Sequence, residues 1–105
     1  MFTRHVSLRL KANSASEFSS VMEKEIIPLL RKQNGFRDEV TLVAPERREA
    51  LAISFWETKE NAEAYSRTGY PEILKILARV VEGSPKVETF ELSNSTFHKI
   101  AAKGA

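Results

Sequence analysis

The sequence predicts an α+β fold in which the elements follow the order β-α-β-β-α-β. Three observations predict it. Apolar and polar residues alternate in residues 3–11, two extended runs at 36–44 and 49–57 flank a short polar connection, and a long extended run at 86–98 follows a second helical region. At 105 residues the chain has room for one hydrophobic core, so we expect a single domain over residues 1–105.

The first predicted strand, residues 3–11, has two chemically different faces. Val6, Leu8 and Leu10 fall on one face, as expected of a strand that is buried on one side. The opposite face carries polar side chains: Thr3, His5, Ser7, Arg9 and Lys11.

A helix is predicted to follow. Ser14 and Glu17 have the spacing of a capping box, and Gly35 suits a left-handed helix end. Pro28 lacks an N–H and crowds the preceding turn, so we expect a kink near it. The apolar stripe of this helix consists of Phe18, Met22, Ile26, Leu29 and Leu30.

The second half of the chain predicts a hairpin and a second helical region. Residues 45–48 connect the strands at 36–44 and 49–57, and Thr58 is placed to cap the next helix. Helical structure with a break at 69–71 is expected through residue 81, followed by a turn at 82–85.

The final run, residues 86–98, is the longest extended segment predicted. At about 3.3 Å per residue it would reach about 43 Å, against about 30 Å for the two hairpin strands. We expect the excess to pair with a second copy of the chain, so the sequence predicts a homodimer.

Composition excludes several classes of protein. There is no cysteine, which rules out disulfides and thiolate chemistry, and neither histidine has the partners of a metal site. The formal charge of +2 is spread along the chain, so nucleic acid is not an expected partner. No signal peptide or membrane span is evident, and we expect a cytoplasmic protein. The tail at 99–105 is expected to be flexible.

The candidate binding residues are aromatic. Phe55, Trp56, Tyr65 and Tyr70 fall where sheet and helices should meet. Core packing is the favoured interpretation of Phe55, whereas Trp56 and the two tyrosines can equally be core residues or the lining of a pocket for a polar aromatic ligand. His5 is the candidate catalytic residue, since histidine accepts protons near neutral pH, although a solvent-facing histidine is the simpler interpretation.

A known family has a similar pattern. Gly35-Phe36 after the first helix, Ser54-Phe55-Trp56-Glu57-Thr58 at the third strand and an acidic, alanine-rich helix resemble the antibiotic biosynthesis monooxygenase (ABM) family over residues 3–96. The resemblance implies a ferredoxin-like subunit, with an antiparallel sheet and helices on one face, that pairs as a dimeric α+β barrel with a pocket in each subunit.

The resemblance also implies an activity. Some members oxidise aromatic polyketides or quinols with O2 and without a metal or flavin cofactor. Loose equivalents of their cavity residues are Trp56, Tyr65, Tyr70 and Arg9. The haem-degrading branch is disfavoured, because Tyr65 and Lys75 stand near the places of its tryptophan and histidine, and the first strand has no asparagine.

Two other functions compete with a cofactor-independent monooxygenase. One is a non-catalytic dimer that binds a small apolar metabolite, because a fold alone does not confer chemistry. The other is an RNA-recognition domain, which has the same order of elements. The third strand lacks the basic-glycine-aromatic signature of that domain, which argues against RNA binding.

Overall fold

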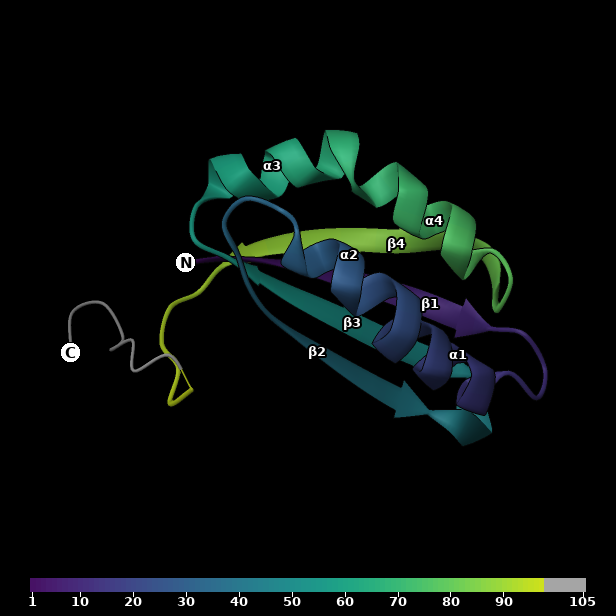
Figure 1. The fold of residues 1–105 in the computed structure, drawn as a ribbon. Helices are drawn as coiled ribbons and strands as arrows, with labels where there is room; N and C mark the ends of the chain where they lie inside the picture. The colour runs from purple at the N-terminus through teal and green to yellow at the C-terminus, as the bar shows by residue number, and fades with distance from the viewer. Residues whose placement is uncertain (98–105) are drawn as a thin grey trace.

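The computed structural model describes residues 1–97 and contains one antiparallel sheet covered by helices on one face (Figure 1). The strand order is β2-β3-β1-β4, the order of a ferredoxin-like fold, so the predicted fold class is confirmed. The strands are β1 (Phe2–Leu10), β2 (Phe36–Ala44), β3 (Glu49–Trp56) and β4 (Val81–Glu91).

Strand β1 lies in the middle of the sheet and has the predicted two faces. Val6, Leu8 and Leu10 are each at most 7% exposed and point toward the helices. In β3, Ala50 pairs with Leu8 and lies on the same side of the sheet. Because side chains alternate along a strand, the other even-numbered residues of β3 also lie on this side. Even-numbered residues of β1 and β3 therefore form the helix-facing side of the sheet.

The first helical segment is one rod with a local defect. It consists of α1 (Ala15–Val21), a π-helical turn (Met22–Ile26) and α2 (Ile27–Arg31). The N–H of Ile27 donates to the carbonyl of Met22, five residues back, directly before Pro28. Pro28 cannot donate a backbone hydrogen bond and crowds the preceding turn, and the helix accommodates it by widening to a π-helical turn. The irregularity predicted near Pro28 is therefore this π turn.

The predicted capping box does not form. Ser14 occupies the N-cap position, but its side chain makes no capping hydrogen bond. Its hydroxyl instead donates to the carbonyl of Ala12 at 3.4 Å. The helix start was predicted correctly and its cap was not, because Ser14 satisfies the preceding loop rather than the helix.

Gly35 closes this segment in the predicted left-handed conformation, with φ of +78°. An added Cβ would lie 2.3 Å from Asn61, whereas the same addition at Gly83, also at positive φ, would meet nothing. We therefore expect Gly35→Ala to destabilise the protein by more than Gly83→Ala, with the difference exceeding about 1 kcal/mol. Urea unfolding of both variants measures this difference, and equal losses would contradict the clash.

The predicted hairpin connection and the predicted start of the second helical region are both present in the structure. A single 3-10 turn, Pro45–Arg47, joins β2 to β3. The Thr58 hydroxyl accepts a hydrogen bond from the Asn61 N–H at 3.0 Å and caps α3 (Lys59–Thr68). Gly69 separates α3 from α4 (Tyr70–Leu77).

The predicted limits of the last helix and strand were wrong. Helix α4 ends at Leu77 rather than at residue 81, and β4 is Val81–Glu91 rather than residues 86–98. Gly83, at φ of +67°, lies where the β1–β4 register shifts, so the stretch predicted as a turn is a bulge within the strand. Past Glu91, Leu92 still donates to the carbonyl of Met1, and residues 92–94 are no longer strand.

The length argument for a dimer therefore loses its basis, because β4 has 11 residues against 9 in β1 and in β2. His98 and the tail predicted at 99–105 lie outside the described residues. None of the helices found in residues 1–97 combines the length and apolar character that crossing a bilayer requires.

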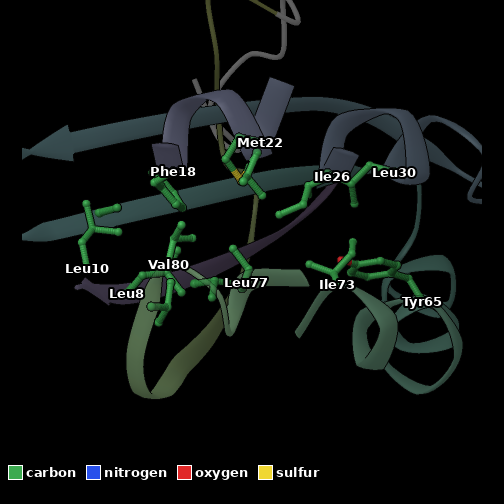
Figure 2. Packing of buried hydrophobic residues seen from close by; sticks show 14 of the residues in the cluster. Leu8, Leu10, Phe18, Met22, Ile26, Leu30, Tyr65, Ile73, Leu77 and Val80 are labelled. Atoms are coloured by element: carbon green, nitrogen blue, oxygen red, sulfur yellow. The ribbon is translucent and has the colours of Figure 1, made fainter. Parts of the chain in front are cut away.

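The core fills the space between the sheet and both helical segments (Figure 2). Phe18, Trp56 and Val80 are completely buried. Figure 2 shows that the labelled side chains of the first segment face those of α4 across β1, and that Tyr65 closes this layer beside Ile73. The labelled residues are Leu8, Leu10, Phe18, Met22, Ile26, Leu30, Tyr65, Ile73, Leu77 and Val80.

The opposite face of the sheet, which we call the open face, carries apolar side chains without helices above them. Leu42 and Phe90 are each 53% exposed, and Val40 is 36% exposed. Leu51 and Ile53 pair directly with Leu42 and Val40 on the same side. An apolar strip thus runs along β2 and β3 on the open face.

Candidate functional site

Three polar residues lie in one row across the helix-facing side of the sheet. Arg4 of β1 pairs with Ser54 of β3, and Ser54 pairs in turn with Glu39 of β2. Neighbouring strands are about 5 Å apart, so the backbones of Arg4 and Glu39 are about 10 Å apart, with Ser54 between them. Polar side chains at this depth are unusual, since the other helix-facing residues of β1 and β3 are apolar.

Arg4 is a buried cation. Only 3% of it is exposed, and its guanidinium carbon lies 4.4 Å from the centre of the Tyr70 ring and 5.1 Å from that of Tyr65. Burial lowers the pKa of Arg4, partly offset by the two tyrosines, but arginine stays charged in proteins. No carboxylate within residues 1–97 forms an ion pair with it. Its charge is therefore compensated mainly by the faces of two aromatic rings.

Three aromatic side chains lie next to one another above this row. The Trp56 and Tyr65 rings are stacked with their centres 4.6 Å apart, and the Tyr70 ring is tilted by 56° against that of Tyr65 at 6.0 Å. The Trp56 indole N–H donates to the Ser54 hydroxyl at 2.8 Å, which holds both side chains in place. Burial raises the pKa values of Tyr65 and Tyr70, so both are neutral phenols at physiological pH.

Glu39 supplies the acidic end of the row. Its Oε2 accepts a hydrogen bond of 2.7 Å from the Thr41 hydroxyl, two residues along the same side of β2. Burial raises the pKa of Glu39, and the Thr41 hydrogen bond opposes that rise. A half-buried carboxylate of this kind can take up a proton nearer to neutral pH than an exposed one.

These groups enclose a cavity of about 30 Å3 between the sheet and the helices. This volume holds a few water molecules at most and is far below the roughly 300 Å3 of a ligand pocket, so a ligand requires side chains to move. Polar lining comes from Arg4, Glu39, Ser54, Tyr65 and Tyr70, and apolar lining from Val6, Leu8, Met22, Ile26, Leu30, Ala52, Ile73 and Leu77.

A larger hollow of about 810 Å3 lies at the other end of the sheet and is open to solvent. Arg9, Arg47 and Lys86 line it, and Arg47 is already paired with Glu49. The smaller cavity is the better candidate site, because it brings a buried cation, a carboxylate and aromatic rings together in a desolvated place.

The structure divides the residues nominated from the sequence between the two faces of the sheet. Trp56, Tyr65 and Tyr70 come together on the helix-facing side, where Tyr65 and Tyr70 line the cavity. His5 lies on the open face, where its ring meets Phe90 edge-on at 4.9 Å and its Nε2 lies 3.1 Å from the Thr3 hydroxyl. Arg9 lies at the larger hollow. These five residues do not form one site within a single chain.

Sequence reasoning missed Arg4 and Glu39. The signal for Arg4 was present, because it falls in phase with Val6, Leu8 and Leu10, on the apolar face of the first strand. A charged residue in that phase must be buried or must end the strand. Glu39 gave no comparable signal, because a bulge between Phe36 and Asp38 shifts the register of β2 against β3.

Solved structures with the same fold include two oxygenases. The first is SnoaB, a cofactor-independent oxygenase from Streptomyces nogalater, with a TM-score of 0.70 and 15% identity over 90% of this chain and 95% of that chain. The second is the ActVA-Orf6 monooxygenase of Streptomyces coelicolor in complex with nanaomycin D, with a TM-score of 0.74 and 12% identity over 90% and 88% of the two chains.

A third similar structure, from Bordetella bronchiseptica, is provisionally described as an antibiotic biosynthesis monooxygenase. It has a TM-score of 0.73 and 15% identity, and covers 87% of this chain and 95% of that one. No protein-family model matches the sequence, and no curated protein matches it. At these identities the comparisons establish a shared fold, which is the fold that the ABM resemblance implied.

Proposed function

We propose that this protein is an ABM-type, cofactor-independent monooxygenase that oxidises a small phenol or quinol-type substrate with O2. The observation that carries the proposal is the buried Arg4, a cation without a carboxylate partner in residues 1–97 that faces two neutral tyrosines. Such a group favours a ligand that becomes an anion next to it. The fold shared with two oxygenases supports the same reaction class.

The chemistry needs an enzyme that stabilises an aromatic anion. A phenolate can donate an electron to O2, so the substrate supplies all the electrons of the reaction. One phenol and one O2 give one quinone and one water, with one oxygen atom retained by the product. Arg4 would hold the anionic oxygen, and the Tyr65 ring, which lines the cavity and is backed by Trp56, would contact the substrate ring.

Binding requires the cavity to open. Of the two aromatic rings that line the cavity in residues 1–97, Tyr70 is the more exposed, because Tyr65 is only 5% exposed. It also lies at the first turn of α4, directly after Gly69. We expect rotation of the Tyr70 side chain to admit the substrate, which then takes its place against the Arg4 guanidinium.

Oxygen uptake tests the proposed reaction. Purified protein mixed with a panel of acidic phenols, naphthols and anthrone-type compounds is expected to consume O2 with at least one of them. Equimolar quinone should form, and added chelator should leave the rate unchanged. An oxygen electrode and product mass spectrometry measure both quantities. A protein that binds members of the panel but never consumes O2 would contradict the proposal.

The alternative is a non-catalytic protein that binds a small apolar metabolite. The closed cavity of about 30 Å3, most of whose lining is apolar, favours this second function. A ligand that co-purifies unchanged and raises the melting temperature in proportion to its concentration would support binding without turnover.

We also propose that the working form is a homodimer. Its support is the open face, where Leu42 of the apolar strip and Phe90 of β4 are half exposed without covering helices. Monomeric proteins rarely leave such a strip in contact with water. Two open faces packed together would cover it, as the ABM resemblance implies.

A further inference from the structure

We propose that Glu39 is the catalytic base of this site, which accepts the phenolic proton of the substrate while Arg4 holds the oxygen that loses it. The inference rests on the proposed function and adds to it a residue for the first chemical step. It implies a substrate that enters as a neutral phenol and becomes an anion only inside the cavity.

The placement of Arg4 and Glu39 supports separate roles, with Arg4 binding the anionic oxygen and Glu39 accepting the proton. Arg4 and Glu39 line one cavity from opposite sides of Ser54, yet no ion pair between them is found in residues 1–97. The guanidinium lies against the tyrosine rings. Cation and carboxylate therefore do not neutralise each other, and both remain available to one ligand in the cavity that they line.

The hydrogen bonding of Glu39 also suits a base. Its Oε2 accepts from Thr41 at 2.7 Å, which fixes the carboxylate, while Oε1 has no hydrogen-bond donor among the described residues. Oε1 is thus the oxygen available to a ligand. Burial of Glu39 supports the role, since a base is most effective when its proton affinity approaches that of the group it deprotonates.

The step is a simple proton transfer. The substrate O–H bond breaks, both electrons of the bond stay on the substrate oxygen, and the proton moves to Glu39 Oε1. The net charge of the cavity is unchanged, because a carboxylate is exchanged for a phenolate closer to Arg4. Groups that face Glu39 in the cavity are Arg4 from β1, Ser54 from β3, Tyr65 from α3 and Tyr70 from α4, with apolar Met22, Ile26 and Leu30 from the first helical segment.

A chromogenic phenol tests the inference without turnover. The probe is 4-nitrophenol, whose anion absorbs visible light, mixed with protein at a pH where the free phenol is neutral. We expect wild-type protein to bind it with the appearance of the anion band. Glu39→Gln, which keeps an oxygen for Thr41, should bind the phenol with a band at least tenfold weaker. Glu46→Gln, at the exposed hairpin tip, should behave as wild type.

Thr41→Val gives a second, independent readout. Loss of its hydrogen bond raises the pKa of Glu39, so the anion band should disappear at a higher pH on acidification than in the wild-type protein. An anion band of unchanged strength in Glu39→Gln would contradict the role of Glu39 as the catalytic base without contradicting the proposed oxygenase function. Failure of wild-type protein to bind the probe, with no O2 uptake from the phenol panel, would overturn both.

Discussion

Arg4→Met is expected to weaken binding of phenolate ligands by about 10- to 100-fold while leaving the protein at least as stable as wild type. Loss of a charge-assisted contact of about 1.5–3 kcal/mol accounts for the weaker binding. Stability should not fall, because methionine fills a similar volume and removes a buried cation that has no carboxylate partner in residues 1–97. Calorimetric titration with 4-nitrophenolate and urea unfolding measure the two effects.

The opposite directions of these effects make the prediction specific. A structural arginine would give a destabilised variant, whereas a binding arginine gives a stable variant that no longer holds the anion. Arg67→Met is the matched control, since Arg67 is exposed on α3 and should leave binding unchanged. Strong binding retained by Arg4→Met, together with a loss of stability, would contradict the role given to Arg4.

Leu42→Glu is expected to convert a dimer into monomers. Leu42 lies in the apolar strip of the open face and is 53% exposed in the single chain. In a dimer packed through this face the substitution would bury two unpaired carboxylates, which costs several kcal/mol and weakens association at least a hundredfold. Sedimentation at micromolar concentration should find a wild-type dimer and a monomeric variant.

Val87→Glu separates this effect from a general effect of charge. Val87 is 38% exposed, but it pairs with the buried Val6 and so belongs to the helix-facing side of β4. The variant should remain dimeric. A wild-type protein that sediments as a folded monomer would show that the open face is not an interface.

Local signals in the sequence predicted much of the fold. The alternation of β1 follows from one buried face, and Thr58 and Gly35 act through their own backbone geometry. Such features need no knowledge of distant residues. The end of the chain could not be predicted in this way, because whether Val81 ends a helix or starts a strand depends on its pairing with Leu10.

The site was harder to predict than the fold. Trp56, Tyr65 and Tyr70 could be nominated because aromatic residues are few and large. His5 and Arg9 fall on the polar face of β1, and the structure places both away from the cavity that Tyr65 and Tyr70 line. The row of Arg4, Ser54 and Glu39 depends on pairing between three strands, and one of its two pairs, Arg4 with Ser54, joins strands that are distant in sequence.

A crystal structure of the protein with 4-nitrophenol bound tests the proposed site most directly. The ring is expected between the sheet and the helices, with its oxygen in contact with both the Arg4 guanidinium and Glu39 Oε1, and with Tyr70 displaced from its present position. A ligand bound only in the larger hollow near Arg9 and Lys86, with the Arg4 cavity still closed, would contradict it.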